Sequence, residues 1–194
     1  MAQRRGRLIV IAGPSGVGKG SVVQELLSRD PGGLVLSISA TTRAARTGEM
    51  DGRDYFFVSE GRFQEMIDGG ELLEWADVFD HRYGTPKGYV ESHLAQGSDV
   101  LLEIDVVGAA EVRLVHPEAL LLLLAPPSME ELTRRLRGRG TESDEKIARR
   151  LAKAAWELDQ GSWFDHVVVN DDLLHASSQV AAIIETSRHR GPDA

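Results

Sequence analysis

The chain has no cysteine, which excludes disulfide bonds and thiolate metal sites. Its six histidines are scattered, without the helical pair that is typical of a zinc site, so a zinc protein is not expected. The longest apolar run spans 119–127 and is far shorter than the roughly 20 residues that cross a bilayer. The start of the chain also lacks the apolar segment of a signal peptide. We therefore expect a cytoplasmic protein without a membrane partner.

Basic residues are in deficit, since 22 Lys and Arg stand against 30 Asp and Glu, and the net charge is −8. A surface that binds duplex nucleic acid needs a basic field to neutralise phosphates, so no nucleic-acid partner is expected. Any phosphate must then be bound by local basic clusters. With 194 residues, 42% hydrophobic and 27% charged, the composition is that of one ordinary globular domain.

A glycine-rich segment follows the apolar run 8–12 and precedes a helical pattern. Its residues are Gly13, Pro14, Ser15, Gly16, Val17, Gly18, Lys19, Gly20 and Ser21. Glycines leave backbone N–H groups free to converge on an anion, and the following helix points its positive end at the same place. Lys19 adds a charge that reaches the β and γ phosphates of a nucleoside triphosphate. A turn without a ligand is the alternative, but a lysine between two glycines is an odd choice for a mere turn.

The position after Lys19 departs from the usual pattern of such loops. A Ser or Thr there ordinarily ligates Mg²⁺, but this chain has Gly20, and the hydroxyl follows one residue later at Ser21. No certain metal ligand is therefore assigned. Mg²⁺ would be held mainly by the phosphates of the nucleotide and by water, with Ser21 as the one candidate side chain.

Near-continuous apolar runs alternate with helical stretches along most of the chain. The runs are 8–12, 34–38, 99–105, 119–125 and 166–170. This alternation predicts a doubly wound α/β core whose parallel sheet is covered on both faces. Thr85 is predicted to cap a helix that begins at Pro86, and 128–131 to open another helix as a capping box.

The pattern changes between residues 40 and 84. Segments 55–58 and 72–76 read as strands of a smaller sheet, joined by a short helix around 63–67. Arg43 and Arg46 lie three residues apart in a hydroxyl-rich loop of this lobe, and guanidinium forks suit a phosphate monoester. A solvated basic turn is the alternative interpretation.

Two tyrosines and three carboxylates could complete an acceptor site. The hydroxyls of Tyr55 and Tyr83 could join a phosphate cradle, although either tyrosine alone could be core or rim packing. Glu74, Glu103 and Asp105 lie in or beside apolar runs and need partners there. A carboxylate can accept the adjacent N1–H and N2–H donors of guanine, which adenine does not offer. Structural ion pairs with arginines are the alternative for Glu103 and Asp105.

A basic segment, 134–150, stands out in this acidic chain. Gly138 and Gly140 interrupt its helical pattern and could hinge a flap, whose arginines could close over transferring phosphates. The alternative is a solvated helical face. Its arginines would then pair with Glu130, Glu131 and Asp144.

In this order, the motifs resemble those of guanylate kinases, from about residue 7 to residue 184. The resemblance rests on 13–19, 39–43 with Arg46, 52–57, 74–76, 83–85, 103–105, 135–136, 139–141, 150–151 and 169–172. Three positions depart from the family's pattern. They are Gly20 where many members carry Ser, Ala45 where a proline is frequent, and Val107 where glutamine is frequent.

The resemblance implies one domain, 1–194, with three parts. These are a P-loop core (about 7–38, 85–136 and 152–186), a small mixed α/β GMP-binding lobe (about 39–84) and a helical lid (about 137–151). It implies an ATP:GMP phosphotransferase that gives GDP or dGDP and ADP by in-line transfer with Mg²⁺, a step in GMP recycling and purine nucleotide metabolism. The partners would be ATP and GMP or dGMP.

The resemblance also assigns roles by position. The GMP phosphate would be held by Ser39, Arg43, Arg46, Tyr55 and Tyr83. The guanine would be surrounded by Glu74, Thr85, Glu103 and Asp105. Residues 13–21 would bind ATP, with Asn170 near the adenine. The catalytic residues would be Lys19, Arg43, Arg135, Arg139 and Arg150.

Three other functions compete with this interpretation. A kinase-like interaction module would bind phosphorylated peptides without ATP chemistry, which Lys19 and the lid arginines disfavour. A kinase of sugar phosphates or of another nucleotide would not need carboxylates that suit guanine. A GTP-hydrolysing switch would carry an Asn-Lys-x-Asp motif, which this chain lacks.

Overall fold

A computed structural model describes residues 5–29, 33–78, 80–138 and 143–189. Contacts along the chain divide it into two compact units. Unit 1 consists of Met1–Leu8, Gly33–Leu102 and Val107–Ala119, and unit 2 of Ile9–Gly32, Glu103–Val106 and Leu120–Ala194. The sequence analysis predicted a different division, into a P-loop core, a GMP-binding lobe and a lid. That division stays a prediction.

A five-stranded sheet contains the apolar runs that the sequence analysis identified. In unit 2, β1 (Leu8–Ala12), β8 (Leu120–Ala125) and β9 (His166–Val169) run parallel in that order. In unit 1, β2 (Leu34–Leu36) pairs in parallel with β7 (Asp99–Glu103). The prediction of a parallel sheet core is therefore confirmed.

Burial is nearly complete along the central strands. Every residue of β1 is buried, as are four of the six residues of β8. Such strands have apolar side chains on both faces because helices cover both. The edge strand β9 departs from this expectation, since Val168 is buried while Val167 and Val169 are exposed. An apolar run alone does not show which strand will lie at an edge.

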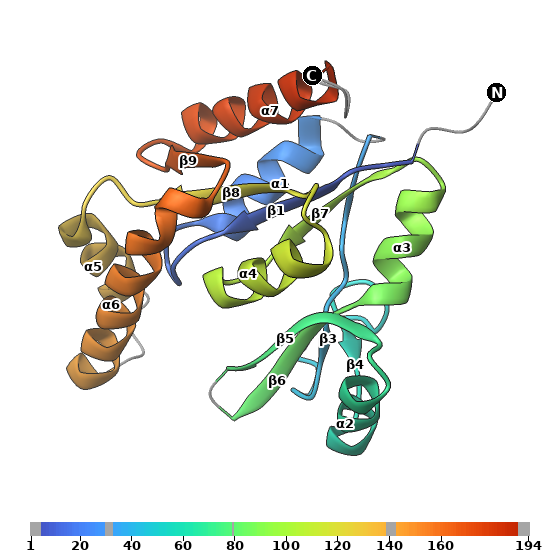
Figure 1. The fold of residues 1–194 in the computed structure, drawn as a ribbon. Helices are drawn as coiled ribbons and strands as arrows, with labels where there is room; N and C mark the ends of the chain where they lie inside the picture. The colour runs from blue at the N-terminus through green and yellow to red at the C-terminus, as the bar shows by residue number, and fades with distance from the viewer. Residues whose placement is uncertain (1–4, 30–32, 79, 139–142, 190–194) are drawn as a thin grey trace. The chain divides into compact units, whose positions relative to one another are not determined.

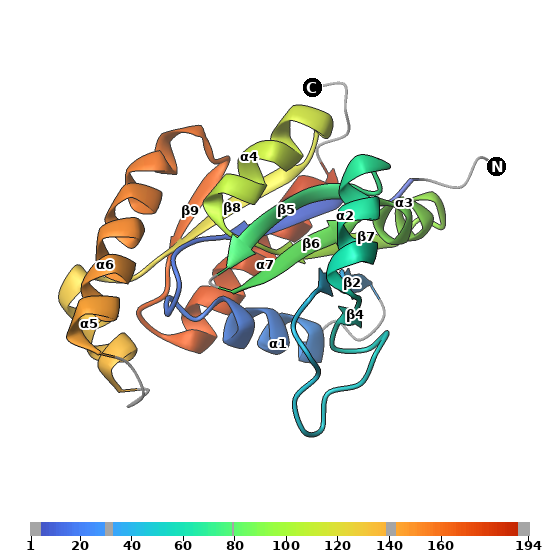
Figure 2. The ribbon, with the colours of Figure 1, turned by 90° about the horizontal axis from the view of Figure 1, so that it is seen from below.

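Four helices of unit 2 pack in two pairs. The first pair is α1 (Lys19–Arg29) with α7 (Leu173–His189), and the second is α5 (Met129–Arg137) with α6 (Asp144–Asp159). Figures 1 and 2 show α5 and α6 side by side. A 3₁₀ turn, Gln160–Trp163, leads from α6 towards β9. Leu132, Leu136, Ile147 and Ala154 are the buried residues between the second pair.

The predicted cap of α5 is present. The Ser128 hydroxyl accepts a hydrogen bond from the backbone N–H of Glu131 at 3.2 Å, which satisfies one of the free donors of the first turn. Among the described residues, no helix has both the length and the apolar character that a bilayer span requires.

Unit 1 contains a second, mixed sheet with the order β4-β3-β6-β5. Its strands are β3 (Ala40–Thr41), β4 (Phe56–Phe57), β5 (Leu72–Val78) and β6 (His81–Pro86). Strand β3 pairs in parallel with β4 and antiparallel with β6, and β6 is also antiparallel to β5. Helix α2 (Glu60–Asp68) belongs to this part of the chain and packs Phe63 and Met66 into a core cluster with Ala40. The sequence pattern predicted β4, β5 and α2, but not β3 or β6.

Two further helices follow the small sheet, α3 (Lys87–Ala95) and α4 (Val106–Val115). The predicted cap of α3 is wrong. The N-cap residue is Pro86, no side chain caps the helix, and the buried Thr85 hydroxyl instead donates to Glu74. Thr85 lies in β6, and its hydrogen bond to the buried Glu74 directs its side chain to the interior rather than to the helix end.

We predict that Phe63→Ala lowers the free energy of unfolding by about 3–5 kcal/mol, because a fully buried ring is replaced by a cavity. Urea denaturation measures this loss. Leu114→Ala is the control, since Leu114 is 83% exposed and its truncation should change stability by less than about 0.5 kcal/mol. Equal losses in the two variants would contradict the prediction.

Candidate functional site

The glycine loop of unit 2 connects β1 to α1 with backbone that other residues cannot adopt without strain. Gly16 has φ +87° and Gly18 has φ +100°, both in the left-handed region. A Cβ on Gly16 would lie 2.6 Å from a methyl carbon of Leu136, and one on Gly18 would lie 2.5 Å from Nδ2 of Asn170. Conformation and packing therefore both require glycine at these positions.

Two side chains from elsewhere in unit 2 bind the loop through the carbonyl of Val17. The Asn170 amide Nδ2 donates to this oxygen at 2.7 Å, and Nη1 of Arg135 donates to it at 3.1 Å. Nη2 of Arg135 also donates to the backbone oxygen of Asn170 at 2.9 Å. Asn170 and Arg135 thus hold the loop in place, a role that the sequence analysis did not assign to them.

Lys19 begins α1 and turns back over the loop. Its ammonium Nζ donates to the carbonyl of Gly13 at 2.6 Å and to that of Pro14 at 3.3 Å. Burial lowers the pKa of Lys19, and the carboxylates of Glu103 and Glu157 act against this shift. The amine is therefore held at the loop by backbone acceptors and by nearby negative charge.

A cavity of about 410 Å³ opens at this loop. Its lining is mainly polar and consists of Ser15, Gly16, Gly18, Lys19, Gly20, Ser21, Gln24 and Glu103. A loop, a helix N-terminus and a half-buried lysine around one polar cavity are the features that suit an anion.

Acidic and basic side chains gather beside the cavity. Lys153 of α6 forms ion pairs with Asp105 at 3.0 Å and with Glu157 at 3.8 Å. Glu157 is only 3% exposed, and burial raises its pKa. Desolvation likewise raises the pKa of Glu103, although its side chain reaches solvent, while Lys19 lowers it.

The partners of these carboxylates are lysines, whereas the sequence analysis considered arginines or guanine. It missed both Lys153 and Glu157. One sequence signal could have revealed this pair. Glu157 follows Lys153 by four residues, in a segment, 151–158, that otherwise consists of alanines and apolar residues.

The basic segment places one arginine directly at the loop. Nη2 of Arg150 donates to the hydroxyl of Ser15. The ion pairs of the alternative interpretation are also present, since Arg134 and Arg135 both bind Glu131 and together lower its pKa to about 2. Arg139, which was predicted to be catalytic, lies outside the described residues.

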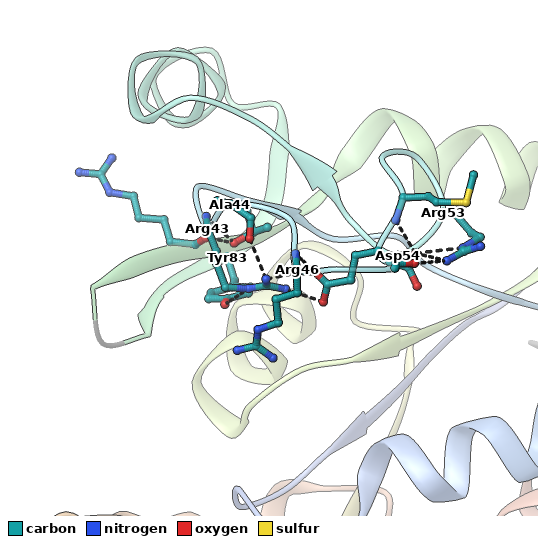
Figure 3. Close-up of polar contacts among 11 residues, drawn as sticks. Arg43, Ala44, Arg46, Arg53, Asp54 and Tyr83 are labelled. Atoms are coloured by element: carbon teal, nitrogen blue, oxygen red, sulfur yellow. Dashed lines mark hydrogen bonds and ion pairs between the residues drawn. The ribbon is translucent and has the colours of Figure 1, made fainter. Parts of the chain in front are cut away.

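In unit 1, Arg43 is surrounded by aromatic side chains. Its Nε donates to the Tyr83 hydroxyl at 3.2 Å, as Figure 3 shows. The guanidinium carbon lies 5.4 Å from the centre of the Tyr55 ring and 5.8 Å from that of Phe57, within cation–π range. The structure thus brings together Arg43, Tyr55 and Tyr83, three of the five residues predicted to bind the acceptor phosphate.

The side chains of the other two predicted phosphate ligands, Ser39 and Arg46, are not among these contacts. Ser39 directly precedes β3, and Arg46 is exposed with its guanidinium directed away from the drawn contacts in Figure 3. Glu49 is a component that the sequence analysis missed. Its carboxylate receives two parallel hydrogen bonds from Arg43, each 2.9 Å long.

A buried carboxylate lies elsewhere in unit 1. Oε1 of Glu74 accepts a hydrogen bond of 2.6 Å from the Thr85 hydroxyl, and both residues are almost fully buried. A Cβ on Gly108 would lie 2.7 Å from Oε2 of Glu74, so α4 approaches the carboxylate closely. Glu74 and Thr85, which were both predicted to face guanine, are therefore paired.

The described ranges contain no group of three or more His, Asp or Glu side chains arranged to hold a metal ion. The oxygen donors at the loop cavity include the hydroxyls of Ser15 and Ser21 and the carboxylate of Glu103. A set of this kind suits Mg²⁺ that keeps most of its water and binds through phosphate oxygens.

A strand, glycine loop, lysine and helix in a parallel α/β sheet define a P-loop nucleotide-binding protein. The family model described as guanylate kinase matches residues 5–187, and the chain belongs to the guanylate kinase family.

Relatives and solved structures agree with this family. The chain is 52% identical over 182 residues to a guanylate kinase of Prochlorococcus marinus, covering 94% of this chain and 96% of the relative. It is 50% identical over 186 residues to that of Symbiobacterium thermophilum, covering 96% and 88%. The crystal structure of guanylate kinase from Anaplasma phagocytophilum has a TM-score of 0.77 at 31% identity, covering 97% of this chain and 89% of that one.

A more distant match shows the fold alone. The SH3-kinase fragment of tight junction protein 3 has a TM-score of 0.55 at 12% identity, covering 98% of this chain and 61% of that fragment.

We predict that Gly18→Ala lowers the free energy of unfolding by about 1–3 kcal/mol, because a Cβ there is strained and meets Asn170. Gly20→Ala is the matched control. Its Cβ would lie 3.6 Å from the Glu103 carboxylate, an ordinary contact, so little stability should be lost. Chemical denaturation compares the two variants, and equal stability would contradict the role given to the loop.

Proposed function

We propose that this chain transfers the γ-phosphoryl group of ATP to GMP or dGMP, giving ADP and GDP or dGDP. Membership of the guanylate kinase family supports this activity. The observation that carries it is the presence of two different phosphate-binding arrangements in one chain. One is the glycine loop with Lys19, and the other is Arg43 among tyrosines.

The donor would bind at the cavity of the glycine loop, lined by residues 13–21. Lys19 is held there by the carbonyls of Gly13 and Pro14, and the more strongly charged triphosphate would replace these acceptors. Asn170 would lie near the adenine while its amide keeps the Val17 carbonyl in place.

The acceptor phosphate would bind in unit 1. Arg43, Arg46, Tyr55 and Tyr83 would donate to its oxygens together with Ser39. Arginine is suited to this task because its planar fork matches the geometry of a phosphate. The exposed Arg46 would add a second positive charge.

The guanine base would be recognised by carboxylates. Glu74 is buried and oriented by Thr85, so it is an ordered acceptor for the N1–H and N2–H donors of guanine. Glu103 and Asp105 would complete this set. Adenine lacks this donor pair and would form neither of these hydrogen bonds, which costs binding free energy.

The transfer itself would need positioning and charge stabilisation rather than a general base. The acceptor phosphate carries about −1.5 to −2 charges at neutral pH and is already a nucleophile. Lys19, Arg135, Arg139 and Arg150 would stabilise the transferring group, and Arg43 would align the acceptor. Arg150 already contacts the loop at Ser15. The reaction would be a direct in-line transfer without a covalent intermediate.

Mg²⁺ would be held mainly by the ATP phosphates and water, since Gly20 removes the usual hydroxyl ligand. When bound, the ion screens the negative charge of the phosphates. The chain's own contribution would be the oxygen donors that line the loop cavity, with Ser21 as the one candidate for direct contact.

An acceptor screen tests the proposed function. Purified protein with ATP and Mg²⁺ is given GMP, dGMP, AMP, UMP and ribose 5-phosphate in turn, and ADP release is followed. We expect acceptor-dependent ADP with GMP and dGMP only. Release with ribose 5-phosphate would point to a sugar-phosphate kinase. If none of the acceptors gives acceptor-dependent ADP, only the interaction module or the GTP switch would remain.

Ser21→Ala tests how the metal is held. If Mg²⁺ is bound through phosphates and water, the Mg²⁺ concentration that gives half-maximal rate should stay unchanged in a titration at fixed ATP. Ser28→Ala on the same helix is the control, because its hydroxyl contacts only the Glu25 carbonyl. An increase of about tenfold or more in Ser21→Ala alone would show that the hydroxyl ligates the ion.

A further inference from the structure

The carboxylate of Glu49 accepts hydrogen bonds from both Arg43 and Arg46. Its two carboxylate oxygens accept from Nη1 and Nη2 of Arg43, each at 2.9 Å, in a two-pronged geometry. The Oε2 atom also accepts from the backbone N–H of Arg46 at 2.7 Å. The Glu49 side chain is 21% exposed and that of Arg43 only 10%, so water screens this contact less than an ordinary surface pair.

Arg43 is held through four of its five guanidinium N–H groups. Besides Glu49, it donates from Nη1 to the carbonyl of Ala44 at 2.8 Å and from Nε to the hydroxyl of Tyr83 at 3.2 Å. The ring of Tyr55 lies against its face. Of the five guanidinium N–H groups, one on Nη2 has no partner among the described residues. The contacts therefore set the direction of that remaining donor.

A second arginine–carboxylate pair in unit 1 serves as a comparison. Arg62 makes the same two-pronged contact with Glu71, but both side chains are 45% exposed. Glu71 does not connect Arg62 to a second arginine in any contact of the described residues. Glu49 differs because one carboxylate fixes both a guanidinium and the backbone that carries Arg46.

We infer that Glu49 is a positioning residue for the acceptor phosphate, an inference that rests on the proposed function. Glu49 holds Arg43 and the Arg46 backbone in the arrangement that receives the phosphate, so less conformational entropy is lost on binding. The charge of Glu49 by itself would repel a phosphate. If Glu49 mainly positions the arginines, removal of its charge should weaken phosphate binding. If Glu49 mainly repels the phosphate, removal of its charge should strengthen that binding.

The experiment compares the affinities of wild-type protein and Glu49→Gln for GMP and for guanosine, by calorimetry without ATP. Glutamine keeps the size of the side chain, but its amide presents N–H to Arg43 and breaks the two-pronged contact. We expect GMP affinity to fall about tenfold or more, the scale of one charge-assisted hydrogen bond. Guanosine affinity should stay unchanged, because guanosine has no phosphate.

Steady-state kinetics supply a second readout on the same variant. The KM for GMP should rise while the KM for ATP stays constant, since the loop cavity of unit 2 is not altered. Glu71→Gln is the matched control. It removes a similar arginine–carboxylate contact from unit 1 and should leave GMP affinity, guanosine affinity and both KM values at the wild-type level.

Three results would overturn the inference. Tighter GMP binding by Glu49→Gln would show that Glu49 competes with the phosphate. Equal losses for GMP and guanosine would show general damage to unit 1. Unchanged GMP affinity would show that Arg43 needs no such support. Wild-type protein that binds GMP no better than guanosine would instead overturn the proposed function, so the two failures are distinguishable.

Discussion

A loop that binds phosphate through its backbone N–H groups must have its carbonyl oxygens bonded elsewhere, and the glycine loop meets this constraint with side chains. Lys19 donates to the carbonyl of Gly13, while Asn170 and Arg135 share that of Val17. Because an unpaired polar group in a buried place costs about 1–3 kcal/mol, these contacts stabilise the loop in its observed backbone conformation.

The glycine loop and the cluster around Arg43 balance their positive charge in different ways. Lys19 lies among backbone acceptors and several carboxylates, and its own burial lowers its pKa. Arg43 lies among aromatic rings and one carboxylate, whose pKa is lowered in turn by the guanidinium and by the backbone N–H of Arg46. Both solutions keep a cation in place before any ligand arrives.

The features that could be predicted from the sequence are those determined by residues close together along the chain. The apolar runs gave the strands of the parallel sheet, and the glycine spacing gave the loop. Strand β6 was not predicted, because His81–Pro86 contains a glycine, a proline and charged residues and forms a strand only through its partners β3 and β5. The predicted cap at Thr85 was wrong for a similar reason, since pairing with the buried Glu74 determined its orientation. Glu49 and Glu157 were missed because their roles depend on contacts that spacing along the chain does not reveal.

Helix α6 carries Arg150, Lys153 and Glu157 at intervals of three and four residues, which places them on one face. The first contacts the hydroxyl of Ser15, the second pairs with Asp105, and the third adds to the electrostatic environment of Lys19. Because a helix moves as a rigid rod, a tilt of α6 changes all three interactions together. The contact at Ser15, the ion pair with Asp105 and the negative charge near Lys19 therefore share one support, so a substitution that shifts the axis of α6 would disturb all three at once.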